Sequence, residues 1–351
     1  MLQASWSRGK DLSHAASNGG LSVPLRELPW NAQLFWHRLQ KLPLRASWSF
    51  CEHESFYFGL VHHLDDPHFR IPGQVLRYRQ AWLGAEAGLR VALQYSPYNS
   101  SPHHPTLLSA ADWLTPLSHF VQDSWAAIPT TVPHYSQDTL LERFFSGVAI
   151  NHWALGPFSE NGGALRRAMI FGMLWPGRPR RAWSASIRDS AGYTGAALAA
   201  NAWLAGATAT ILTAEPPDVP QILEWQFRQL EPHSQIREIG QWVVSEFYCG
   251  KTWQDWYQQL ATRCHYYPAD HVVPNSAWIV GAILWGGLDW DNTIKLAAQD
   301  GFDPIGRSLI VGALLGLSDA SVPDLPPSVT HTLIKHADTT FECARAHTSI
   351  L

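Results

Sequence analysis

The segment 195–213, GAALAANAWLAGATATILT, most constrains how this chain folds, because alanine and other small residues dominate it. Alanine is the strongest helix former, and small side chains let the backbones of neighbouring helices approach closely. Pro216 and Pro217 follow the segment, and proline cannot continue a helix. The sequence therefore predicts a helix at 195–213 that packs tightly against its neighbours.

Further helical patterns lie on both sides of this segment. Gln74–Gln94 places apolar residues on one face with helical spacing, and the turn Asn161-Gly162-Gly163 opens a short helix that ends near Pro176. Runs of alternating apolar and polar residues, which are typical of strands, are scarce. We therefore expect an all-α, compact multi-helix bundle, with further helices at 220–230, 234–247, 252–262, 275–285, 290–299 and 307–317.

The chain has 351 residues, which allows one large domain or two. Residues 1–24 are polar and rich in Ser and Gly, so we expect them to form a flexible N-terminal segment. No shift of composition divides the rest, and we predict a single all-α domain over residues 25–351.

Charge and apolar content exclude several classes of partner. The formal net charge is −4, so no surplus of basic residues is present to neutralise phosphates, and nucleic-acid binding is not expected. The longest apolar run, Ala277 to Leu288, is too short to span a bilayer. The four cysteines are far apart and form no C-x-x-C pair, which is typical of free thiols in a reducing compartment. We therefore expect a cytoplasmic protein with no membrane partner.

The segment 297–316, AAQDGFDPIGRSLIVGALLG, carries the most information about function. An apolar helix ends, a Gly301-Phe302-Asp303 turn follows, and a helix of small residues begins. Asp303 then lies near a helix N-terminus, where unpaired N–H groups and the helix dipole favour a carboxylate. Two interpretations stay open from the residues alone: Asp303 is a structural N-cap, or it is a functional carboxylate.

This segment resembles the C-terminal signature of the ADP-ribosylglycohydrolase family, in which Gly-x-Asp-Thr-Asp or a close relative precedes a Gly- and Ala-rich helix. Earlier segments are similar to other family elements in the same order. Residues 160–166, ENGGALR, resemble the family's Gly-Asn-Gly-Ala-Ala-Met-Arg element, and residues 185–197 resemble its Ser/Thr-His stretch and small-residue helix. Residues 273–298 resemble the helix pair before the signature. The resemblance is clearest over residues 160–317 and implies the compact all-α fold of this family.

The resemblance also implies a metal centre that this chain retains only in part. Family members typically hold two Mg²⁺ or Mn²⁺ ions between an N-terminal Asp-Asp-Thr and a C-terminal Asp-x-Asp-Thr. This chain keeps Asp303, but Ile305 stands where the second aspartate belongs and Gly306 where the hydroxyl ligand belongs. At the N-terminal side the best match is Asp65-Asp66, followed by proline instead of threonine. Hard divalent ions need several oxygen ligands.

We therefore expect at most one Mg²⁺ ion, held by Asp65, Asp66 and Asp303, with no bound ion as the alternative. The same three carboxylates, Asp303, Asp65 and Asp66, are the predicted catalytic residues. They could act without metal, because acid and base catalysis at a glycosidic centre needs only two carboxyl groups at a suitable separation.

The predicted substrate-binding residues come from the matched elements. Asn161-Gly162-Gly163 offers backbone N–H groups to a phosphate or is simply a helix cap, and Arg307 either pairs with Asp303 or binds a phosphate. Asp189 takes the place of the family's histidine. The full predicted set is Asn161, Gly162, Gly163, Arg166, Asp189, Tyr193, Asn275 and Arg307.

Two functions follow as hypotheses. The first is an ADP-ribosylglycohydrolase-like hydrolase that cleaves a glycosidic bond to ADP-ribose, ribose or a related nucleoside. Its partner would be a small molecule or an ADP-ribosylated substrate. The second is a catalytically impaired family member that binds a nucleotide or ADP-ribose-like ligand, or another protein. The missing metal ligands at 305 and 306 indicate a damaged metal site, and the polar residues retained around Asp303 favour a specific ligand in either case. Of the two, we expect the hydrolase.

Overall fold

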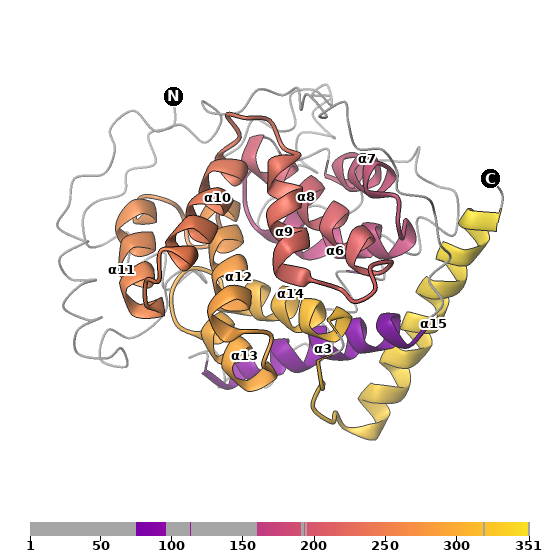
Figure 1. Cartoon of the computed structure of the whole chain (residues 1–351). Coiled ribbons are helices and arrows are strands. Elements are labelled where there is room, and N and C mark those ends of the chain that lie inside the picture. The colour runs from indigo at the N-terminus through magenta and orange to yellow at the C-terminus, as the bar shows by residue number, and fades with distance from the viewer. Residues whose placement is uncertain are drawn as a thin grey trace, which may run out of the picture.

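The structure is a computed structural model that describes residues 75–95, 113, 160–190, 193, 195–318 and 320–349 (Figure 1). These residues form helices and one isolated β-bridge, with no strand among them, which confirms the all-α prediction. The helices are α3 (Val75–Tyr95), α6 (Gly163–Leu174), α7 (Pro179–Asp189), α8 (Gly195–Ile211), α9 (Val219–Arg228), α10 (Gln235–Tyr248), α11 (Trp253–Cys264), α12 (Val272–Gly286), α13 (Trp290–Ala298), α14 (Pro304–Leu317) and α15 (Pro327–Ser349).

The predicted small-residue helix, α8, is the central element. Every one of its residues except Thr210 is buried, and α6, α7 and α9 pack around it (Figure 1). The close approach is visible at Gly172 of α6, where an added Cβ would lie 2.4 Å from the Cβ of Thr208. The small side chains of α8 therefore allow the close packing against neighbouring helices that the sequence predicts.

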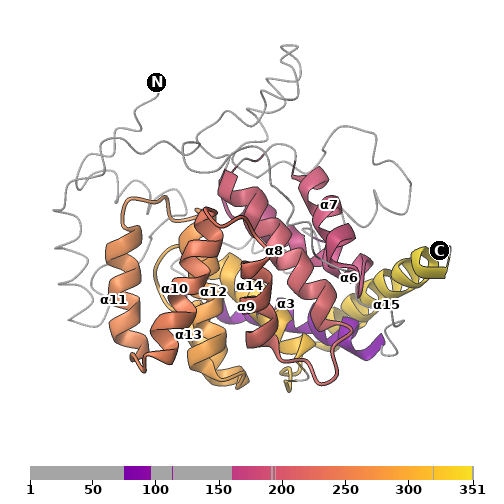
Figure 2. The same cartoon turned by 45° about the horizontal axis from the view of Figure 1, so that its top comes forward.

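Two helices that are far apart in sequence, α3 and α14, make the most extensive contact between described elements and lie side by side in both views (Figures 1 and 2). Glycines on both helices make this contact possible. A Cβ on Gly84 would lie 2.1 Å from the carbonyl oxygen of Gly312, and a Cβ on Gly312 would lie 2.1 Å from that of Gly84. The two backbones therefore touch directly at this crossing.

An aromatic cluster fills the space between α11, α12 and the loop that carries Asp303. Trp253, Trp256, Trp278 and Trp285 contact one another with ring centroids 4.9–6.4 Å apart, and Phe302 packs edge-on against Trp278. Large aromatic side chains bury much apolar surface at such contacts. The cluster therefore gives the 299–303 loop a rigid base.

Two helices were not expected from the sequence. Helix α7 begins at Pro179, which suits a first helical turn, and α15 is largely polar and packs beside α3. Helix α14 begins at Pro304 rather than at residue 307, because Asp303 caps it. Among the described residues, no helix combines the length and the apolar character needed to cross a bilayer.

Candidate functional site

Two loops that precede helices meet at the site. Asn161, before α6, and His271, before α12, form an antiparallel β-bridge. The N–H of Val272 donates to the carbonyl of Glu160 over 3.0 Å, and the N–H of Gly162 donates to the carbonyl of Asp270 over 2.5 Å. The N-termini of α6 and α12 are therefore fixed side by side.

A buried hydrogen bond between His271 and Glu160 anchors this junction. His271 Nε2 lies 3.1 Å from Glu160 Oε2, and both side chains are almost completely buried. Glu160 Oε1 accepts the N–H of Ala196 at the start of α8, and His271 Nδ1 accepts the N–H of Val273. Because Nδ1 is an acceptor, the imidazole proton belongs on Nε2, where it is donated to Glu160. The pair joins α6, α8 and α12, and neither side chain faces a ligand.

Asn275, a predicted site residue, connects the 269–271 loop to Asp303. Its Nδ2 donates to the carbonyls of Ala269 and His271, at 2.9 and 2.8 Å, and its Oδ1 accepts the N–H of Asp303 over 3.1 Å. These carbonyls flank Asp270. One buried amide therefore sets the position of Asp270 relative to Asp303.

Arg307, also predicted, is buried beneath the turn. It donates to the carbonyls of Ala297, Gln299 and Gly301, and its guanidinium lies 4.0 Å from the centroid of the Trp278 ring. Burial lowers its pKa to about 9, against the opposing charges of Asp303 and Asp300. The two roles considered for Arg307 were an ion pair with Asp303 and phosphate binding. The structure instead has the side chain holding the 297–301 turn from inside.

The turn itself has unusual backbone geometry. Gly301 has φ 125° and Phe302 has φ 51°, and a positive φ at a bulky residue costs roughly 1–2 kcal/mol. The buried Phe302 ring and the three carbonyl contacts of Arg307 hold this conformation. Such backbone strain is often found at functional sites.

Asp303 is the N-cap of α14, as one of its two interpretations predicts. Its Oδ1 accepts the N–H of Gly306 over 3.0 Å, and its Oδ2 lies 3.7 Å from Nη1 of Arg166. The Asp303 side chain is 20% exposed and that of Arg166 is 26% exposed, so solvent reaches both. The capping role and a functional role are therefore compatible.

Asp270 was not predicted, and the structure brings it to the same place. Burial raises the pKa of its carboxyl group and the negative charge of Asp303 raises it further, while interactions with His271, with the backbone and with Arg166 oppose this. The residue is only partly buried. Asp270, Asp303 and Arg166 thus form a charged trio, held by the buried residues Asn275 and Arg307 and by the Glu160–His271 pair. The sequence signal would have been an aspartate directly before a helix cap, which is too common to select.

Tyr193 and Asp189, both predicted, lie deeper. Asp189 Oδ2 accepts a hydrogen bond from Arg167 Nε over 2.9 Å, and both side chains are nearly buried. The Tyr193 hydroxyl is buried close to Arg167, and burial raises its pKa. These residues extend the charged network inward from Arg166.

The N–H groups of the 161–163 turn are engaged within the chain. Gly162 donates to Asp270, and Gly163 donates to the side chain of Asn161 over 3.1 Å. As they stand, these two donors serve the loop junction, which is the helix-cap alternative considered for this turn.

The oxygen donors expected for two metal ions are not present at this turn. Ile305 and Gly306 offer no side-chain oxygen, and the described residues contain no cluster of three or more His, Cys, Asp or Glu side chains suited to a metal ion. Asp65 and Asp66 lie outside the described residues. The described part of the site therefore does not fit a two-ion centre.

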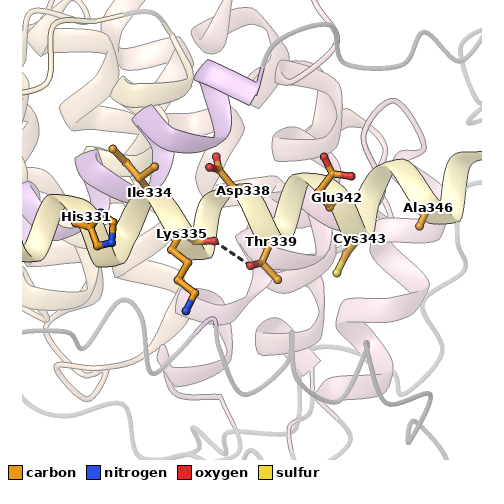
Figure 3. Close-up of a pocket in the computed structure, with 8 residues that line it drawn as sticks. All are labelled: His331, Ile334, Lys335, Asp338, Thr339, Glu342, Cys343 and Ala346. Atoms are coloured by element: carbon orange, nitrogen blue, oxygen red, sulfur yellow. Dashed lines mark hydrogen bonds between the residues drawn. The ribbon is translucent and has the colours of Figure 1, made fainter.

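A separate groove of about 660 Å³ runs along α15 (Figure 3). Its described lining comes from one helix face and includes Ile334, Lys335 and Cys343. Within this helix, the Lys335 carbonyl accepts a hydrogen bond from the hydroxyl of Thr339 over 2.9 Å. Among the described residues, none of the predicted site residues lines this groove.

Comparison with known proteins agrees with the resemblance seen in the sequence. A family model described as ADP-ribosylglycohydrolase matches residues 77–339, well over half of the chain, so the chain belongs to the ADP-ribosylglycohydrolase family. A solved structure described as an ADP-ribosylglycohydrolase-related protein complex is 15% identical, with a TM-score of 0.48. The alignment covers 77% of this chain and 98% of that one. No curated protein matches.

Proposed function

We propose that this protein is a hydrolase that cleaves a glycosidic bond to ribose in an ADP-ribosyl or related substrate. The observation that carries the proposal is the charged trio of Asp270, Asp303 and Arg166 at the meeting point of three segments within the family match. Two carboxyl groups in different environments are the usual equipment for glycoside hydrolysis.

In the proposed reaction, Asp270 acts as the acid and Asp303 as the base, and each proton is accounted for. As the bond from the anomeric carbon to the leaving group breaks, the Asp270 carboxyl gives its proton to the leaving atom. A water molecule attacks the anomeric carbon and gives a proton to the Asp303 carboxylate, and solvent then returns that proton to Asp270. The raised pKa of Asp270 supports the role of acid, and the partial exposure of the Asp303 carboxylate, which lets water reach it, supports the role of base. Asp65 and Asp66 stay predicted members of the acidic centre.

The test is release of ADP-ribose from a mono-ADP-ribosylated peptide, followed by chromatography. We expect Asp303→Asn and Asp270→Asn each to lower kcat at least about 100-fold, because acid–base catalysis contributes roughly 10²–10⁴-fold. Asp291→Asn, an exposed aspartate on α13, is the matched control and should be unchanged. Wild-type chain that releases no ADP-ribose would refute the proposal.

The second candidate is a family member that binds ADP-ribose without turnover. The engagement of both Asp303 oxygens inside the protein favours it. Calorimetry with free ADP-ribose distinguishes the two: binding with no hydrolysis of the peptide supports the second function.

A further inference from the structure

The carboxylate of Asp303 already has a protein partner on each oxygen. The N–H of Gly306 donates to Oδ1 over 3.0 Å, and the Arg166 guanidinium faces Oδ2 at 3.7 Å. The first contact completes the α14 cap, and the second brings a full positive charge from α6. Arginine stays charged at all ordinary pH values and is less strongly hydrated than an ammonium group. The negative charge of Asp303 is thus compensated from within the chain.

Glycine at position 306 is required for this arrangement. A Cβ there would lie 2.3 Å from Asp303 Oδ2 and 3.4 Å from the Cδ of Arg166. Heavy atoms do not approach to 2.3 Å without a bond, so any other residue would push the carboxylate away from its place beside Arg166. Gly306 stands where the family pattern has a hydroxyl ligand. Its presence therefore removes that metal ligand and also leaves room for the ion pair between Arg166 and Asp303.

We infer that Arg166 supplies the positive charge at Asp303 in this chain and that Asp303 is not a metal ligand. A divalent ion would have to displace Arg166 or lie beside a like charge, and it would find no side-chain oxygen at Ile305 or Gly306. The inference deepens the proposed function, on which it rests for the identity of the site.

Titration of the full chain with Mn²⁺ alone, followed by calorimetry, tests it. We expect the wild-type protein and Asp303→Asn to bind Mn²⁺ equally. We expect Arg166→Gln, which removes the positive charge beside Asp303, to bind Mn²⁺ at least tenfold more tightly than wild type. Asp289→Asn is the matched control, because Asp289 caps α13 through the N–H of Asn292 over 2.9 Å and is exposed.

A micromolar Mn²⁺ site that is lost in Asp303→Asn but kept in Asp289→Asn would overturn the inference, and so would unchanged affinity in Arg166→Gln. If Arg166→Gln does not fold, the double variant Ile305→Asp/Gly306→Ser takes its place, with the same expected gain and the same contradicting result. Because the measurement is cation binding and not turnover, an inactive wild-type enzyme would count against the proposed function alone.

Discussion

Asn275 and Arg307 illustrate, at the scale of single residues, how a side chain serves a site without facing a ligand. Both were predicted to bind substrate, and both are buried with their hydrogen bonds directed to the loops that carry Asp270 and Asp303. The sequence pattern located them correctly near the site, since polar residues in a family motif mark that region. It did not reveal their contacts, because side-chain direction depends on tertiary packing.

Asp270 gives a residue-scale prediction on pH. Its pKa is raised in the folded protein, so the folded state binds more protons than the unfolded state once pH exceeds the ordinary aspartate value. Its contribution to the free energy of unfolding is therefore greatest at low pH and falls as pH rises through the raised pKa. Asp270→Asn removes this decline. We expect the variant to gain stability relative to wild type as pH rises from the ordinary aspartate pKa through the raised one.

Urea denaturation at a series of pH values measures this difference. Asp291→Asn, on the exposed side of α13, should show no such trend. A difference between Asp270→Asn and wild type that stays constant with pH would contradict the assignment.

At the scale of helices, the crossing of α3 and α14 is a place where helix propensity and packing predict opposite changes in stability for the same substitution. Alanine is about 1 kcal/mol more favourable than glycine inside a helix, so propensity alone predicts that Gly312→Ala stabilises the protein. The structure predicts the opposite, because the new Cβ would lie 2.1 Å from the Gly84 carbonyl oxygen. We expect a loss of about 3 kcal/mol in the free energy of unfolding, since overpacking against rigid backbone is costly.

Gly250→Ala is the comparison for this helix prediction. Gly250 has open space around it but a φ of 77°, so its substitution tests backbone strain without overlap and should cost roughly 1–2 kcal/mol. Chemical denaturation of both variants gives the two values. A Gly312→Ala protein as stable as wild type would show that the helices are not in direct backbone contact.

At the scale of the whole molecule, the order of helices from 163 to 317 was largely predictable, because small-residue runs, caps and Gly or Pro stops mark each one. Helices α7 and α15 were missed because most of their residues are polar and their buried faces contain few large apolar side chains. The site was only partly predictable. Asp303 and Arg166 come from motifs, whereas Asp270 joins them through a β-bridge that no local pattern encodes.

The N-terminal carboxylates remain a prediction. The family match begins at residue 77, after Asp65 and Asp66. Both residues lie outside the described residues, so their substitution in the ADP-ribose release assay tests this prediction.

The central claim is that the carboxyl groups of Asp270 and Asp303, with Arg166 as their counter-charge, act without a metal ion at Asp303. Its most direct test is single-turnover release of ADP-ribose from a mono-ADP-ribosylated peptide in excess EDTA. We predict that wild-type release continues at an unchanged rate in EDTA and falls at least about 100-fold in Asp303→Asn. Release that stops in EDTA and returns when Mg²⁺ or Mn²⁺ is added would contradict the account.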